Sequence, residues 1–442
     1  MEFQSNEVKE ISELSHFIKH ISHPLNNEND LDPLMELIGD AKFVLLGEAT
    51  HGTHEFYTWR ANISKRLIKE KKFSFIAVEG DWPDCYRLNR YIKHYNKSGE
   101  HAKDILQSFN RWPTWMWANW EIVSFAEWMR KHNSEIPMSK RVGFYGLDVY
   151  SLWESVEAVK NYLKIHDKES LDLLNRVINC FEPFGNKEGG SYAQATQILT
   201  YSCETEVLNL LNEIRKKINT YPTDRESAFS TEQNALVTVN AEHYYRTMLK
   251  GDVTSWNIRD RHMMETLNRI TKFYGTDSKA IVWEHNTHIG DARATDMWRH
   301  GMINLGQLTK EEHEKKGVVR VGFGTYSGSV IAGRKWNGKL RIMELPEAKE
   351  GSIEKMMHEA GGNNKLFISS QMKKHSFFRR PADHRAVGVV YQSENDKINN
   401  YVPSKLDERY EAFIFIDETT ALHPLHVLSD AHQTPDTYPF GF

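Results

Sequence analysis

Residues 47–52, Gly47-Glu48-Ala49-Thr50-His51-Gly52, combine a carboxylate and an imidazole directly after a short apolar segment. Histidine titrates near neutrality, so His51 is able to take a proton from water or an alcohol at working pH. A helix that begins just after this segment would bring its positive N-terminal end close to a developing oxyanion. We therefore predict that Glu48 and His51 face a cleft as catalytic groups. The alternative is a helix-starting turn whose histidine only packs.

Arg60 is a second unusual residue, because it shares a predicted helix face with Phe56, Ile63 and Leu67. That face should lie against the sheet, and arginine is rarely buried without a charged partner. The available partners are the carboxylates of Glu48 and Glu79. Such a group would form either the floor of a catalytic site or a purely structural ion pair.

Glu79 follows the next apolar segment, in Val78-Glu79-Gly80-Asp81-Trp82. If the strands that precede Glu48 and Glu79 are neighbours, the two carboxylates end side by side. Close carboxylates perturb each other's pKa, so that one is held protonated or acts as a base. Asp81 and Asp84 fit turn or cap positions better.

Two histidines three residues apart, His285 and His288, follow a third apolar segment. They do not form the H-E-x-x-H motif, because Glu284 precedes both. A zinc site would need a third protein ligand, which Glu48, Glu79 or His51 could supply; of these, Glu79 is the residue we would assign to it. The other roles are hydrogen-bond donation to a carbonyl oxygen and proton shuttling. Our prediction is a site without a metal and without a cofactor.

An aromatic stretch, residues 112–120, follows the second apolar segment and carries Trp115 and Trp117. It is predicted to form an apolar wall for a bulky substrate. We also assign substrate contact to Trp82 and Asn286. For any single tryptophan, packing in the core is the alternative.

These groups need a scaffold that brings strand ends together. The segments 43–46, 73–78, 141–145, 279–283, 318–323, 386–391 and 412–416 are short, apolar and strand-like, and most of them end in polar residues. Helical periodicity between the first two segments indicates a βαβ unit with parallel strands. The sequence thus predicts an α/β protein with a mainly parallel sheet flanked by helices. Ligands bind outside the carboxyl ends of such strands.

The domain organisation follows from where the strand signal stops. Residues 151–275 carry helical periodicity alone, which predicts a helical insertion lobe over the cleft. The sheet-forming core then consists of residues 1–150 and 276–430, with a loop-rich stretch at 345–385. Residues 431–442 are predicted to be an irregular tail.

The composition narrows the functional class. The net charge of −4 offers no basic surface for nucleic acid or an anionic membrane. The N-terminal residues lack the pattern of a leader peptide, and no apolar run is long enough to span a bilayer. Cys85, Cys180 and Cys203 have no metal-ligand spacing, so we expect buried, reduced thiols in a cytoplasmic protein. A G-x-S-x-G elbow is absent, which argues against a serine nucleophile.

Long segments resemble the erythromycin esterase family. Residues 47–60 and 78–84 are similar to its opening signature, and residues 282–293 to its second signature. Residues 255–260 and 415–419 also fit. The resemblance extends over roughly residues 30–425, and the matching strings are long and specific.

The resemblance implies an α/β protein with a helical lobe and a deep cleft. Characterised members hydrolyse the macrolactone ester of erythromycin and so confer resistance, and related sequences are labelled succinoglycan biosynthesis proteins. By resemblance, His51 is the general base, and Glu48, Glu79, Arg60, His285 and His288 complete the site. Glu284 stands where the family mostly has a small residue, so we expect it to alter either the charge of the pocket or the pKa of the two histidines.

The sequence thus predicts an esterase that acts on a small-molecule ester or lactone. His51 would activate water, Glu48 or Glu79 would orient His51, and His285, His288 and Arg60 would hold the oxyanion. One alternative is a metal-dependent hydrolase built on the histidine pair. The other is a binding protein that sequesters a small apolar molecule without catalysis.

Overall fold

The protein is built around one large, mostly parallel sheet. The structure, a computed structural model, describes residues 2–185, 190–198, 202–221 and 224–426. In spatial order the sheet contains β1 (Ser22–Pro24), β8 (Lys365–Ile368), β11 (Ala412–Thr419), β6 (Val318–Gly333), β2 (Phe43–Leu46), β5 (Ala280–Trp283), β3 (Phe75–Asp81) and β4 (Gly143–Asp148). The six strands from β11 to β4 run parallel to their neighbours. This confirms the predicted fold class.

Successive residues of the strands pack alternately into two hydrophobic clusters, one on each face of the sheet. Because both faces are covered, the strand sequences are continuous apolar runs. Val44 and Leu46 face one cluster, whereas Phe43 and Leu45 face the other. The first cluster is covered by α2 (Asp32–Ile38), α3 (His54–Lys71), α4 (Trp82–Ile92), α5 (Ala102–Gln107) and α6 (Trp120–Ser134). The second is covered mainly by α1 (Glu2–Ile21), α12 (Asp252–Tyr274), α14 (Leu305–His313) and α15 (Ile353–Glu359).

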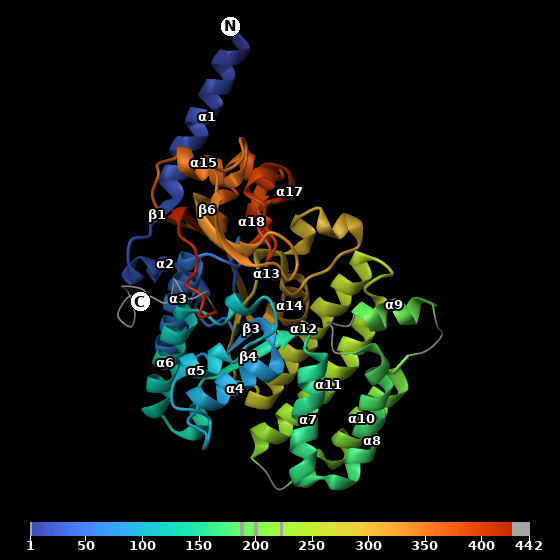
Figure 1. Cartoon of the computed structure of the whole chain (residues 1–442). Coiled ribbons are helices and arrows are strands. Elements are labelled where there is room, and N and C mark those ends of the chain that lie inside the picture. The colour runs from blue at the N-terminus through green and yellow to red at the C-terminus, as the bar shows by residue number, and fades with distance from the viewer. Residues whose placement is uncertain (1, 186–189, 199–201, 222–223, 427–442) are drawn as a thin grey trace.

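The described residues between 152 and 274 are almost entirely helical. Their helices are α7 (Leu152–His166), α8 (Leu171–Phe181), α9 (Gly190–Ile198), α10 (Glu204–Lys217), α11 (Arg225–Thr247) and α12. Helices α7 to α11 gather on one side of the molecule, at the lower right of Figure 1, around an apolar cluster of their own. Helix α12 also packs against β4. The division into core and lobe stays a prediction.

The remaining elements are short. They are β7 (Leu340–Leu345), antiparallel to β6, the antiparallel pair β9 (Ala382–Arg385) and β10 (Tyr401–Ser404), and the helices α13 (Asn286–Ile289), α16 (Ser369–Met372), α17 (Asp396–Asn399) and α18 (Leu406–Arg409). Residues 345–385 therefore contain β8 and α15, not only loops. Residues 431–442, predicted to be an irregular tail, lie outside the described residues. Among those described, no helix combines the length and apolarity that crossing a bilayer requires.

Two expectations about strands are wrong. Strands β2 and β3 are not neighbours, because β5 lies between them and pairs with both. Residues 386–391 form only isolated bridges, Thr50 with Val387 and Gly333 with Val390. This segment crosses the loop that follows β2, where the Val387 amide donates to the Ala49 carbonyl at 2.7 Å.

The cysteines also differ from expectation. Cys180 and Cys203 form a disulfide within the helical segment, with their Cα atoms 5.9 Å apart. The prediction of reduced thiols is therefore wrong for Cys180 and Cys203. The odd number of cysteines gave no sign of this disulfide. Cys85 is a buried free thiol, as predicted.

Candidate active site

The carboxyl ends of β2, β5, β3 and β4 meet beside a cavity of about 360 Å³. Its polar lining includes His51, Glu79, Asp148, Arg259, His285 and His288. Glu48, at the end of β2, lies directly behind His51. Because β5 separates β2 from β3, the residues that follow β5, including His285, lie between Glu48 and Glu79.

Two glycines explain the shape of the loop that follows β2. A Cβ on Gly47 would lie 2.1 Å from Oδ1 of Asn286, and one on Gly52 would lie 1.9 Å from the Ile331 carbonyl oxygen. Both positions therefore require the absence of a side chain. The close approach brings His51 to the cavity just before α3 begins at His54.

His51 is held by Glu48, with 2.8 Å between Nδ1 and Oε1. A carboxylate oxygen accepts, so Nδ1 donates, and the Nε2 lone pair of the neutral ring is left to act as a base. Burial lowers the pKa of His51, but the carboxylates of Glu79 and Glu48 more than compensate, so the pKa is raised above 6.5. The raised pKa makes His51 a stronger base than a free histidine.

Arg60 lies beneath this pair and does not line the cavity. Its Nη2 donates to Oε2 of Glu48 at 2.6 Å, and its guanidinium stacks on the rings of Tyr57 and Trp283. The side chain is fully buried. The predicted contact of Arg60 with the substrate carbonyl is therefore wrong in position, whereas its predicted pairing with Glu48 is present.

The guanidinium that lines the cavity belongs to Arg259 on α12. It donates to Oε1 of Glu79 at 2.7 Å and to Asp148 at 2.9 and 2.6 Å. Burial lowers its pKa, but Asp148, Tyr150 and Glu79 raise it well above the usual range. The charge on Arg259 is therefore permanent, and it directs a positive group at the cavity.

His288 positions Arg259. Its Nε2 lies 2.9 Å from Nη1 of Arg259, and its Nδ1 lies 3.0 Å from both oxygens of Asp260. Arginine has no acceptor, so Nε2 of His288 must accept and Nδ1 must carry the proton toward Asp260. Trp256 stacks on the ring with 4.4 Å between centroids.

His285 is neutral. Burial, followed by the nearby His51, lowers its pKa well below 6.5. Its Nδ1 caps α13 by accepting from the Thr287 amide at 3.3 Å. In this tautomer Nε2 carries the hydrogen, and this nitrogen is itself buried although the residue borders the cavity.

The pKa values of the two buried carboxyl groups of Glu79 and Glu284 are shifted in opposite directions. Burial raises the pKa of Glu79, but the positive charges of Arg259 and protonated His51 and the backbone amide of His285 lower it by more, so this carboxylate is ionised. Burial and the neighbouring Glu79 raise the pKa of Glu284 well above its usual range. In the described part of the chain, neither oxygen of Glu284 has a hydrogen-bond partner. Glu284 does not line the cavity, and its raised pKa favours the neutral carboxyl group, which argues against a direct effect on the pocket's charge.

Of the four residues predicted to contact the substrate, one lines the cavity and three do not. Trp117 lines the cavity. Trp82 and Trp115 are buried in the two cores, and Trp82 stacks on Tyr145. Asn286 is buried and pins the loop to β6 through Phe323, at 2.6 and 3.2 Å. For these last three, substrate contact is wrong.

The geometry does not favour the metal alternative. Within the described residues, Glu79, His285 and His288 do not form a group whose ligand atoms all lie within 4.8 Å of one another. Both nitrogens of His288 are engaged, by Arg259 and Asp260.

Sequence reasoning assigned no role to Arg259 or Asp148. Asp148 ends β4, so its strand-end position was a usable signal. Arg259 lies within a helix, where the sequence alone does not show that it turns toward the sheet. The signal that could have found it is the resemblance, because Arg259 lies within residues 255–260, which fit the family.

Comparison with known proteins places this geometry in context. The family model for erythromycin esterase matches residues 68–419, which include Glu79, Arg259, His285 and His288 but not Glu48, His51 or Arg60. An erythromycin esterase type II of Escherichia coli is 21% identical, over 87% of this chain and 97% of the relative. A putative hydrolase of Bacillus subtilis, YbfO, is 20% identical, over 92% of this chain and 91% of the relative.

Solved structures share the fold. A succinoglycan biosynthesis protein superposes with a TM-score of 0.73 at 20% identity, covering 93% of this chain and 98% of the other. A mutant of the erythromycin esterase EreC in its open conformation gives a TM-score of 0.64 at 15% identity, covering 89% and 95%.

Proposed function

Because the chain belongs to the erythromycin esterase family, we propose that it is a hydrolase that cleaves an ester or lactone with a water molecule activated by His51. The observation that carries this proposal is the Glu48–His51 pair, 2.8 Å apart, at the wall of a cavity that also presents Arg259. General-base catalysis of this kind contributes about 10²–10⁴-fold.

In the proposed reaction, Nε2 of His51 takes a proton from water while the water oxygen bonds to the carbonyl carbon. The carbonyl electron pair moves onto its oxygen, and the resulting oxyanion is stabilised by Arg259, with the His285 ring beside it at the cavity wall. The tetrahedral intermediate then expels the alkoxide, which takes the proton back from His51. The products are one carboxylic acid and one alcohol, or a hydroxy acid from a lactone.

The other site residues act through these groups. Glu48 orients His51 and stabilises its imidazolium form, and Arg60 holds Glu48. Glu79, Asp148 and His288 hold Arg259. All of this machinery is preorganised in buried ion pairs, which suits electrostatic stabilisation of a transition state.

The substrate is proposed to be a compact ester or lactone. The cavity of about 360 Å³ lies near the lower end of ligand pockets, which span about 300–1,000 Å³. Its apolar wall includes Phe109, Met116, Trp117, Trp336 and Val389. A macrolide is larger than this cavity, so cleavage of a macrolide would require the cavity to open. A cytoplasmic location also stays a prediction.

The binding-protein alternative is less consistent with the site. Several ionised groups converge on the cavity, and desolvating them is costly for a site that only holds an apolar molecule.

The test is incubation of the purified protein with simple esters, lactones and macrolides, followed by mass spectrometry, with His51→Ala as the control. The proposal predicts that at least one compound of the panel gains the mass of one water molecule with the wild-type protein. With His51→Ala this product should be absent. Tight binding of a panel member without any product would favour the binding protein instead.

A further inference from the structure

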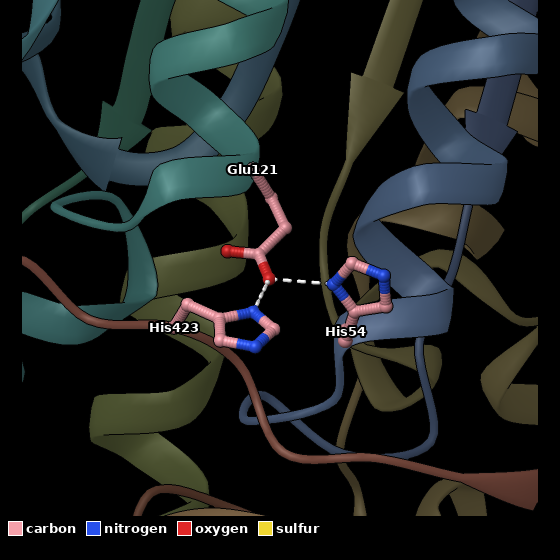
Figure 2. A group of neighbouring side chains, drawn as sticks. All are labelled: His54, Glu121 and His423. Atoms are coloured by element: carbon pink, nitrogen blue, oxygen red, sulfur yellow. Dashed lines mark hydrogen bonds and ion pairs between the residues drawn. The ribbon is translucent and has the colours of Figure 1, made fainter. Parts of the chain in front are cut away.

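A second polar cluster lies outside the cavity, where two helices begin. It consists of His54 at the start of α3, Glu121 in the first turn of α6, and His423 in the segment after β11 (Figure 2). Nδ1 of His54 and Nδ1 of His423 lie 2.6 and 2.7 Å from the same atom, Oε1 of Glu121. None of the three residues lines the catalytic cavity.

The three residues have the chemistry of a transition-metal site. Their ligand atoms all lie within 4.8 Å of one another. Two imidazoles and a carboxylate are a ligand set that Zn²⁺ accepts, at about 2.0–2.2 Å from each atom. Ligands at the corners of such a tetrahedron are about 3.4 Å apart. The two histidines would therefore have to move away from Oε1 by less than 1 Å.

The carboxylate supplies a second, independent observation. Glu121 is buried, with 2% of its side chain exposed. Among the described residues, no hydrogen-bond partner reaches its Oε2. An orphaned carboxylate oxygen is costly inside a protein, and a cation bound to this carboxylate would remove that cost.

The backbone already holds the three ligands in place. We call residues 420–425 the C-terminal strap. The Thr420 carbonyl accepts from the His54 amide, the His423 carbonyl accepts from the Trp120 amide, and the Leu422 amide donates to the Gly52 carbonyl, at 2.9, 2.9 and 3.0 Å. Glu55 accepts from both the amide and the hydroxyl of Thr420 at 2.8 Å. Preorganisation of this kind lowers the cost of binding.

We propose that His54, Glu121 and His423 bind one divalent transition-metal ion, Zn²⁺ in particular, which fastens the C-terminal strap to the first turns of α3 and α6. His423 is the solvent-facing ligand, with 42% of its side chain exposed, so water completes the coordination on that side. The ion takes no part in ester hydrolysis. It stabilises the folded state, because the unfolded chain does not bring the three ligands together.

The test uses the full chain, first treated with a chelator and then freed of it. Zn²⁺ binding is measured by competition with a chromophoric chelator, and the thermal unfolding midpoint is measured with and without Zn²⁺. The variants are Glu121→Gln and His423→Ala, and His300→Ala is the control, because His300 is an exposed histidine outside the cluster. Circular dichroism checks that each variant is folded.

We expect one Zn²⁺ per chain in the wild type and in His300→Ala, with a higher unfolding midpoint when Zn²⁺ is present. His423→Ala and Glu121→Gln should each weaken binding at least tenfold and lose the shift in midpoint. Absence of stoichiometric Zn²⁺ binding in the wild type would overturn the proposal. A Zn²⁺ affinity of Glu121→Gln and His423→Ala equal to that of the wild type would overturn it as well. Either result would leave the proposed esterase activity untouched.

Discussion

Oε1 of Glu48 lies 2.8 Å from Nδ1 of His51, and Oε2 of the same carboxylate lies 2.6 Å from Nη2 of Arg60. One buried carboxylate therefore joins a structural cation to the proposed base. This arrangement fixes which nitrogen of His51 faces the cavity, and it separates the role of Arg60 from that of Arg259.

Replacing Glu48 by glutamine should weaken His51 as a base but leave the histidine itself in place. Glu48→Gln keeps the shape of the side chain but removes the charge that stabilises the imidazolium, so kcat should fall by about 10²-fold with a small change in KM. Steady-state kinetics with Glu36→Gln, an exposed glutamate, as the control would check this. An unchanged kcat in Glu48→Gln would mean that Glu48 does not assist His51.

The pH dependence follows from the raised pKa of His51. His51 accepts a proton only when it is neutral, so kcat/KM should rise with pH and level off above that pKa. The midpoint of the rise should lie above 6.5, and in Glu48→Gln it should move to lower pH, because a carboxylate that raises the pKa is gone. A wild-type activity that increases as the pH falls below 6.5 would contradict this assignment.

Arg259 should be sensitive even to a conservative change. Lysine keeps the charge but loses the fork that contacts Glu79, Asp148 and His288 together. We expect kcat to fall by about 10²-fold in Arg259→Lys, as on removal of an oxyanion donor. Arg261→Lys on the same helix, at an exposed position, is the control. Equal kcat in the two variants would remove Arg259 from the mechanism.

Glu284 and Glu79 should respond differently to the same substitution. Glu284 is neutral, so Glu284→Gln should leave kcat/KM within about threefold and the free energy of unfolding within about 1 kcal/mol. Glu79 is ionised and paired with Arg259, so Glu79→Gln should lower the free energy of unfolding by about 3–5 kcal/mol. Urea unfolding of the two variants beside the wild type would measure both. A larger loss in Glu284→Gln would show that its carboxylate is charged.

Much of the site was predictable because its residues end buried strands. Glu48, Glu79 and His285 each follow an apolar run, and parallel strands bring their carboxyl ends to one edge of the sheet. The parallel character of the sheet followed from the same runs.

The order of the strands was not predictable from local patterns. Strand β5 enters between β2 and β3 from more than 200 residues away in the sequence. Nothing in the two early strands specifies that neighbour, so the prediction that their ends are adjacent failed. Strand-end position was also a poor guide for Trp82, which begins α4 and packs against Tyr145 instead of the cavity.

The central claim is tested most directly by kcat/KM of His51→Ala relative to the wild type, on the ester that the substrate panel identifies, with the unfolding midpoint measured on the same preparations. We predict a decrease of about 10²–10⁴-fold with a nearly unchanged midpoint. A kcat/KM within a few-fold of the wild type would show that His51 is not the base, and would contradict the proposed mechanism.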